Sequence, residues 1–240
     1  MKIGEDFDMI EKSTFREVSM KIIAHIETDF PEKFGIPRQS GLVEELKGRI
    51  VFEPEYNLED AVKGIEDFNY IWLLWRFDVP EAEHFQATVR PPRLGGNETR
   101  GVFASRSPFR PNSIGLSSVR LERVEYSSRG PVLHVAGADL KDGTAIYDIK
   151  PYLHYVDCHE DATDGFARLG QKHILKVDIS PELLGKVPGE KQDALLKVLS
   201  LDPRPSYQED EGRIYGMKYA DFDIHFQVSG DLLTVTGIDR

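Results

Sequence analysis

The 240-residue chain lacks the features of several large protein classes. It has one cysteine, Cys158, which excludes an internal disulfide and a cysteine-based metal cage. No apolar run approaches the roughly 20 residues that a membrane helix needs, and the acidic N-terminus has no apolar signal-peptide stretch. These absences predict a cytoplasmic protein that is not bound to a membrane.

Common catalytic and cofactor motifs are also missing. The seven histidines show no HxH or HExxH spacing, so the sequence predicts no metal site. There is no GxSxG elbow and no Cys–His signature, and no GxGxxG run follows a predicted strand. Triad hydrolysis and a Rossmann nucleotide site are therefore unsupported.

Positive charge is scarce over the whole chain and concentrated in one segment. The 30 basic and 41 acidic residues give a net charge of −11, which alone argues against a nucleic-acid-binding protein. Residues 1–85 hold 10 basic and 19 acidic side chains, whereas residues 86–130 hold eight basic and three acidic ones. The eight basic residues are all arginines, and they either pair with nearby acids on a solvated surface or bind anions. As a cluster they favour one anion-binding face.

Short apolar segments predict a protein made mainly of β-strands. The strand candidates are residues 20–28, 49–52, 70–77, 101–105, 116–126, 131–138 and 144–149. Apolar residues at helical spacing predict one helix over 58–68. Many short strands with few helices between them indicate a closed or nearly closed barrel, not a doubly wound sheet.

A polar, glycine-containing stretch over residues 157–171 is the best linker candidate. Beyond it, the pattern predicts a small α+β unit with strands over 172–178, 213–219, 222–228 and 232–237 and a helix over 181–201. The predicted organisation is an N-terminal extension over 1–19, a barrel domain over 20–160 and a C-terminal domain over 170–240.

Three polar motifs could carry chemistry. Residues 88–116 combine prolines, which fix φ, with glycines, which permit positive φ, so this loop can hold polar side chains in a defined shape. In residues 138–152, Asp142 is either a turn residue before Gly143 or a hydrogen-bond acceptor for a ribose or an amine. Residues 202–207 are either a clamp for a nucleotide or a stiff helix exit.

Together these motifs resemble the TsaA-like (TrmO) family from about Met20 to the C-terminus. The resemblance is carried by Arg90–Asn97, Gly101–Ser107, Phe109–Asn112, Ile114–Gly115, Asp139–Leu140, Asp142–Thr144, Asp148–Tyr152, Pro37–Gln39, Gly41–Val43 and Asp202–Tyr207. It implies a β-barrel that binds S-adenosylmethionine outside the Rossmann architecture, often as a homodimer with the cofactor near the interface, and a small C-terminal domain. It also implies N6-methylation of threonylcarbamoyladenosine next to the tRNA anticodon.

The resemblance assigns roles to particular residues. The implied cofactor contacts are Pro37, Arg38, Gln39, Arg106, Leu116, Asp139, Asp142, Gly143 and Thr144. The implied tRNA contacts are Arg90, Arg93, Arg110, Arg204 and Tyr207. Asn112 and Asp142 are the candidates for accepting the N–H of the reacting nitrogen. Ser113 stands where the family usually has proline in its Arg-Pro-Asn-Pro-Ile-Gly run, which predicts a softer loop.

Two other functions remain open at this point. A non-catalytic RNA-binding module would use the arginine segment to hold phosphates and would have no affinity for S-adenosylmethionine. A methyltransferase with a different RNA base or a small molecule as acceptor would keep the cofactor site. A cofactor titration separates the first alternative, and the identity of the methylated product separates the second.

Overall fold

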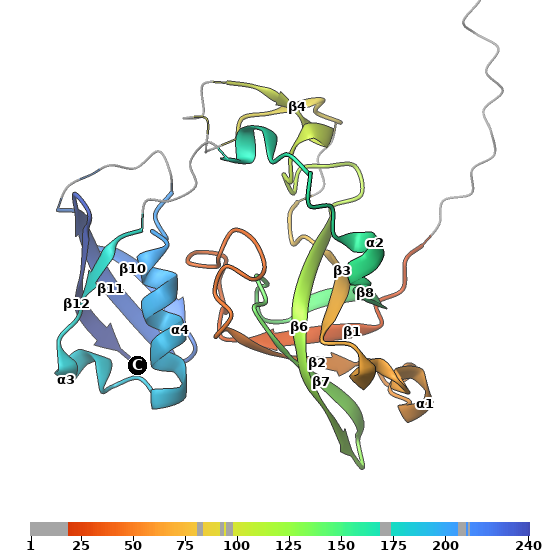
Figure 1. Cartoon of the computed structure of the whole chain (residues 1–240). Coiled ribbons are helices and arrows are strands. Elements are labelled where there is room, and N and C mark those ends of the chain that lie inside the picture. The colour runs from red at the N-terminus through yellow and green to blue at the C-terminus, as the bar shows by residue number, and fades with distance from the viewer. Residues whose placement is uncertain are drawn as a thin grey trace, which may run out of the picture.

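The computed structural model describes residues 19–80, 84–91, 94, 98–168, 174–205, 210 and 212–240. Within these residues the chain forms a closed barrel and a separate four-stranded sheet (Figure 1). Most of the predicted extension over 1–19 lies outside them, as do Arg93 and Tyr207. In this part of the chain, no helix is long and apolar enough to cross a membrane.

The barrel confirms the predicted mainly β fold. Its six strands follow the order β1-β2-β7-β6-β3-β8, and β8 closes the barrel by pairing with β1. The strands are β1 (Ala24–Thr28), β2 (Lys47–Phe52), β3 (Tyr70–Arg76), β6 (Ile114–Ser127), β7 (Gly130–Ala136) and β8 (Thr144–Pro151). A separate two-stranded pair consists of β4 (Thr88–Val89) and β5 (Arg100–Gly101).

Side-chain alternation fills the barrel interior. In β3, Ile71, Leu73 and Trp75 are buried and the residues between them are more exposed, as expected for an antiparallel strand with one face in a core. The apolar run is continuous because the outer face of β3 is also partly covered. There, Trp72 donates from Nε1 to Oδ2 of Asp157 at 3.0 Å, so the indole N–H has a partner outside the barrel.

The helix predicted over 58–68 is wrong as a single element. The structure has a short helix α1 (Glu59–Val62) and a 3-10 helix η1 (Ile65–Asp67). Gly64 lies between them with φ +84°. This left-handed conformation, which glycine adopts without steric cost, ends the first helix after one turn.

The predicted strand over 101–105 is also wrong, because only Gly101 belongs to β5 and the chain then forms the 3-10 helix η3 (Val102–Ala104). The helix predicted over 181–201 divides into α3 (Pro181–Leu184) and α4 (Gly189–Ser200). Pro188 directly precedes α4, and proline is favoured at a helix start and disfavoured inside a helix.

The C-terminal unit is a four-stranded sheet with α4 against it. The strand order is β10-β11-β12-β9, and β9 runs parallel to β12. The strands are β9 (Lys176–Asp178), β10 (Tyr215–Tyr219), β11 (Phe222–Ser229) and β12 (Leu232–Asp239). Before it, the chain forms α2 (His154–Asp157) and the 3-10 helix η4 (Gly165–Arg168). Helix α4 contributes Ala194, Leu195, Val198 and Leu199 to the core.

The two hydrophobic cores differ in which parts of the sequence supply their residues. Among the described residues, the buried cluster of the barrel runs from Ala24 to Ile146. The cluster of the C-terminal unit includes Phe30, Val43 and Leu46, which lie between β1 and β2. Residues 29–46, termed the connecting loop, therefore belong to the barrel by sequence and to the C-terminal unit by packing. Figure 1 shows this loop beside α4.

Candidate cofactor-binding site

A groove of about 410 Å³ opens at the turn that leads into β8. One wall is the segment Arg76–Val79, which begins at the last residue of β3, and the other is Lys141–Ala145. The predicted site residues Asp142, Gly143 and Thr144 all line this groove. The groove therefore combines carboxylate, ammonium and aromatic groups in one concave surface.

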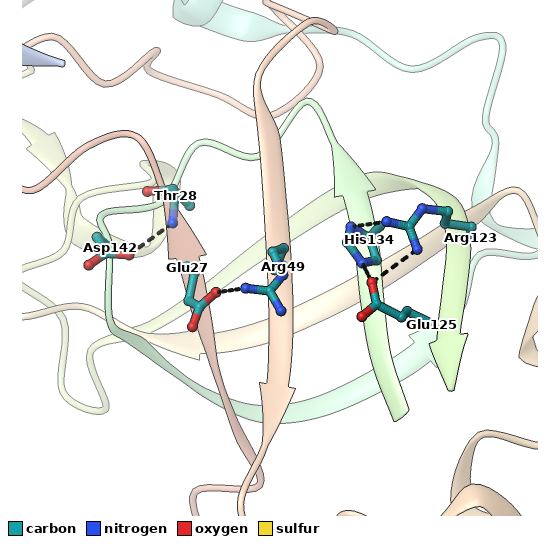
Figure 2. Close-up of polar contacts among 7 residues, drawn as sticks. All are labelled: Glu27, Thr28, Arg49, Arg123, Glu125, His134 and Asp142. Carbon is teal, nitrogen blue, oxygen red and sulfur yellow. Dashed lines mark hydrogen bonds and ion pairs between the residues drawn. The ribbon is translucent and has the colours of Figure 1, made fainter. Parts of the chain in front are cut away.

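Hydrogen bonds from the end of β1 hold the Asp142 turn. The backbone N–H of Thr28 donates to Oδ1 of Asp142 at 2.9 Å (Figure 2). The N–H of Asp142 in turn donates to the carbonyl of Phe30 at 2.8 Å, and Gly143 adopts φ +74°. One oxygen of Asp142 is thus used to fix the turn, which supports the turn-residue interpretation of this aspartate.

Asp78 places an ionised carboxylate at the groove. Its pKa lies below the usual value, mainly because Lys141 donates a hydrogen bond to it and secondarily because of the charge of Lys33. The Nζ of Lys141 is 3.3 Å from Oδ2 of Asp78, and that of Lys33 is 3.6 Å away. The sequence motifs do not include Asp78, but a polar residue directly after an apolar strand is a signal that could have indicated it.

A second polar cluster is built around Asp139. The hydroxyl of Ser117 donates to Oδ1 of Asp139 at 2.6 Å, and Nε1 of Trp75 donates to Oγ of Ser117 at 3.0 Å. Burial raises the pKa of Asp139, and the hydrogen bond from Ser117 opposes that rise. Because the indole N–H occupies the acceptor side of Ser117, the serine proton is directed at the carboxylate.

Gly115 makes this arrangement possible. It lies opposite Trp75 in the β3–β6 pairing, and a Cβ at this position would be 2.3 Å from the indole ring. The Trp75 ring also meets the Phe77 ring edge to face, with centroids 4.3 Å apart. Since Phe77 lines the groove, the Asp139 cluster and the groove adjoin each other through these two rings.

Arg106 joins the Asp139 cluster from the loop after η3. Its Nη1 donates to Oε1 of Gln39, and its positive charge acts on Asp139. Three predicted cofactor residues from distant parts of the sequence are thus brought together. The remaining three differ in exposure: Pro37 is buried, Arg38 is exposed and Leu116 is 55% exposed.

The loop before β6 is held by its own hydrogen bonds. The Nη1 of Arg110 donates to the carbonyls of Ser105 at 3.1 Å and Ser107 at 3.4 Å. Ser113 has φ +44° and donates its N–H to the carbonyl of Arg110 at 3.1 Å. Proline cannot adopt this φ and has no N–H to donate, so serine permits a turn that proline at this position would prevent. Asn112 is exposed in this turn.

The predicted tRNA contacts have different environments. Arg90 is exposed after β4. Arg204 has a side chain only 14% exposed, and its Nε and Nη2 donate to the two carboxylate oxygens of Asp202, each at 2.8 Å. This forked pair supports the helix-exit interpretation of residues 202–207.

The arginines of residues 86–130 do not form one face. Arg106 precedes the start of β6 and Arg129 follows its end. The strand has 14 residues and therefore spans roughly 45 Å. In Figure 1 the β6–β7 hairpin and the β4 region lie at opposite ends of the barrel. The expectation of a single basic face is therefore wrong.

A row of ionisable residues crosses the outer surface of β1, β2, β7 and β6. The strand register places Glu27 opposite Arg49, Arg49 opposite His134 and His134 opposite Arg123 (Figure 2). The Nε2 of His134 is 2.8 Å from Oε2 of Glu125, and this hydrogen bond is the main cause of a lowered pKa for Glu125. Glu27 thus pairs with Arg49, and Glu125 with His134, across neighbouring strands.

A closed antiparallel barrel with a polar groove, followed by a small α+β unit, defines a class of two-domain barrel proteins outside the Rossmann architecture. The chain belongs to the TrmO family. Residues 25–158 match the tRNA-methyltransferase O N-terminal domain, and residues 172–240 match the TrmO C-terminal domain. The predicted family and the predicted class of enzyme are confirmed.

Relatives match along most of the chain. The "tRNA (adenine(37)-N6)-methyltransferase" of Escherichia coli K12 is 38% identical over 215 residues, which cover 86% of this chain and 92% of that protein. The "Putative S-adenosylmethionine-dependent methyltransferase RcsF" of Pseudomonas aeruginosa PAO1 is 38% identical over 216 residues, covering 87% and 91%. A solved structure described as "Crystal structure of TrmO" has a TM-score of 0.76 and 31% identity, covering 94% of this chain and 100% of the other.

Proposed function

We propose that the protein methylates N6 of the adenosine at position 37 of tRNA, uses S-adenosylmethionine as methyl donor, and takes threonylcarbamoyladenosine as the acceptor base. The observation that carries this proposal is the convergence of Gln39, Arg106 and Asp139 beside the groove in a member of the TrmO family. The E. coli relative, 38% identical, is named for the same reaction at adenine 37.

The residues present fit the chemical groups of S-adenosylmethionine. The ribose hydroxyls and the ammonium group require acceptors, which Asp78 and Asp142 supply at the groove. The carboxylate of the cofactor requires a cation, and Lys141 lies next to Asp142 on one wall of the groove. Phe77 and Val79 offer apolar surface for the adenine.

The remaining cofactor contacts that we propose come from the family motifs. They are Pro37, Arg38, Gln39, Arg106, Leu116, Asp139, Gly143 and Thr144. Among them, Arg106 and Asp139 form the charged part of the site next to the groove.

The main task of this chain in the reaction is to align the methyl donor with the acceptor nitrogen. When bound, S-adenosylmethionine supplies an electrophilic methyl group on a positively charged sulfur. This chain would hold the acceptor N6 against that methyl group, and an acceptor on this chain would take up the proton that N6 loses. Asn112 and Asp142 are the proposed acceptors for that N–H. Since Oδ1 of Asp142 accepts from Thr28, its Oδ2 is the oxygen proposed for this role.

The proposed tRNA contacts follow from exposure as well as from the motifs. Arg90 is exposed directly after β4, and Arg93 and Tyr207 are proposed from the motifs alone. Arg110 and Arg204 are engaged within their own loops, and we propose that they support those loops more than they bind phosphate.

We further propose a homodimer in the cytoplasm. Phe85, Phe103 and Phe109 are 59%, 73% and 58% exposed, and the rings of Phe85 and Phe103 stack with centroids 6.1 Å apart. Large exposed apolar side chains near a site are typical of an interaction surface. Light scattering tests this proposal, and a monomeric mass at micromolar concentration would contradict it.

Two measurements test the proposed function. Mass spectrometry of tRNA nucleosides from a deletion strain is expected to show loss of methylated threonylcarbamoyladenosine, and an unchanged level would overturn the proposal. Calorimetry with S-adenosylmethionine is expected to show loss of binding in Arg106→Ala, because this variant removes the cation beside Asp139. Equal affinity in Arg106→Ala and wild type would remove the site assignment. Wild-type protein that binds tRNA but not S-adenosylmethionine would be the non-catalytic RNA-binding module.

A further inference from the structure

Three consecutive residues at the end of β1, Thr28 to Phe30, connect the groove to the C-terminal unit. The N–H of Thr28 donates to Oδ1 of Asp142 at 2.9 Å, and its hydroxyl donates to the carbonyl of Leu140 at 3.0 Å. The carbonyl of Phe30 accepts from the N–H of Asp142 at 2.8 Å. Residues 28–30, termed the bracket, thus hold the Asp142 turn from both flanking positions.

The middle residue of the bracket, Asp29, is held by the C-terminal unit instead. The Nζ of Lys191, in α4, lies 2.5 Å from Oδ1 of Asp29, and the two side chains are only 30% and 20% exposed. The N–H of Ala220 donates to the carbonyl of Asp29 at 2.7 Å. Next to this pair, the rings of Phe30 and Tyr219 meet edge to face with centroids 5.6 Å apart.

The contact continues along the connecting loop. Gly35 has φ +93°, and a Cβ there would lie 2.1 Å from Sδ of Met217, so only glycine lets the loop lie this close to β10. The rings of Phe34 and Phe226 stack with centroids 6.5 Å apart. Two residues after Gly35, the same loop carries the proposed cofactor contacts Pro37–Gln39. The C-terminal unit therefore supports two separate segments of the proposed site.

We infer that Lys191 and Asp29 are positioning residues, through which the C-terminal unit fixes the Asp142 turn in its cofactor-binding conformation. This inference rests on the proposed function for the identity of the ligand. The physical reason is that rotating the peptide units around Asp29 would displace both bracket groups that bond to Asp142. Because the ion pair is largely shielded from solvent, it constrains these peptides more than a screened surface pair would.

A consequence is coupling between the two units. A ligand that binds the C-terminal unit and shifts the Lys191–Asp29 pair must change the affinity for the cofactor. By linkage, the cofactor must change the affinity for that ligand by the same factor.

The test compares variants of the full-length chain. Lys191→Met removes the ammonium group and retains an unbranched side chain, and Lys191→Arg is the conservative variant. Lys218→Met is the matched control, because Lys218 pairs at 3.1 Å with Asp223 inside the C-terminal sheet. Three quantities are measured: the Kd of S-adenosylhomocysteine by calorimetry, amide exchange of peptides covering residues 140–144, and the melting temperature.

The expected result for Lys191→Met is a Kd about fivefold to tenfold higher and faster exchange at residues 140–144. Lys191→Arg is expected to restore most of both losses, and Lys218→Met to match wild type in both. Unchanged Kd and exchange in Lys191→Met would overturn the inference, whatever its melting temperature. Equal losses in Lys218→Met would also overturn it, because they would show general destabilisation.

Two further outcomes are covered by the same design. If wild-type protein binds no S-adenosylhomocysteine, the proposed function fails, and the exchange data still decide whether Lys191 holds the turn. If Lys191→Met does not fold, Asp29→Asn removes the same ion pair with almost no change in volume. Exchange at residues 140–144 equal to wild type in Asp29→Asn would then overturn the inference.

Discussion

The barrel closes its core with residues between Ala24 and Ile146, whereas the C-terminal unit needs Phe30, Val43 and Leu46 from the connecting loop to close its own. In packing, therefore, the smaller unit depends on the larger one, as expected because small units bury a smaller fraction of their surface. At the proposed site the dependence is reversed, since the Asp142 turn rests on a bracket that α4 holds. Under the inference above, the unit that needs the connecting loop to complete its own core also positions part of the proposed site in the other unit.

The largest predicted effects come from the same Leu→Ala truncation made in each of the two cores, which tests whether the units depend on each other unequally. Leu133 in β7 and Leu195 in α4 are both 0% exposed, so Leu→Ala at either position should lower the free energy of unfolding by about 2–5 kcal/mol. Leu133→Ala should lower amide protection in both units, because the connecting loop loses its anchor. Leu195→Ala should lower it in the C-terminal unit and the connecting loop, with β3 and β6 still protected.

Hydrogen exchange under mildly denaturing conditions measures the two patterns directly. Loss of protection in β3 and β6 of Leu195→Ala, equal to that of Leu133→Ala, would contradict the unequal dependence. The two units would then unfold as one cooperative structure.

The barrel could be predicted from the sequence because each strand carries its own alternation. Ile71, Leu73 and Trp75 mark the inner face of β3 without reference to any other segment. The strand order could not be predicted, since β2 pairs with β7 and β3 with β8 across long stretches of chain. The helix predicted over 58–68 fails at Gly64, where a local backbone preference overrides the apolar spacing.

The candidate site also has one part that local sequence predicts and one part that only the strand pairing creates. The turn at Asp142 and Gly143 is local, so the Asp-Gly pair predicts it. The family motifs supply Arg106, Gln39 and Asp139, but neither Trp75 nor Ser117. Their pairing exists only because the barrel places β3 beside β6, and no pattern within either strand encodes it.

A second prediction compares the loss of stability when one serine in each unit is replaced by alanine. Ser117→Ala removes the donor to Asp139 and the acceptor of Nε1 of Trp75, which should cost about 1–3 kcal/mol of stability. Ser200→Ala in α4 removes only a bond to the Lys197 carbonyl near the surface, which should change stability by less than about 0.5 kcal/mol.

The pH dependence gives the Ser117 prediction a separate readout. The pKa of Asp139 is raised in the folded state, so the unfolded chain loses this proton first. Stability from this group is therefore lost as pH rises from the usual aspartate pKa to the folded value. Loss of the Ser117 hydrogen bond should raise the folded pKa further and extend that decline to higher pH. Urea midpoints between pH 3 and 8 (about the range of the transition) measure it, and identical profiles would contradict the role of Ser117.

The smallest predicted effects concern tRNA affinity and stability when one arginine in each unit is replaced. Arg90→Gln should weaken tRNA binding a few fold and reduce the slope of log affinity against log salt by about one, because Arg90 is exposed and is a proposed tRNA contact. Arg204→Gln should leave that slope unchanged and lower stability by about 1 kcal/mol, because Asp202, which has φ +53°, loses its forked partner at the exit of α4.

Filter binding over a salt series and thermal unfolding separate the two arginine variants. An equal reduction of slope in both would mean that Arg204 leaves Asp202 when tRNA binds. The C-terminal unit would then contribute charge to the substrate interface in addition to its support of the connecting loop. An unchanged slope in Arg204→Gln would confine its role to support, and the difference between the units would then hold for tRNA as well as for the cofactor.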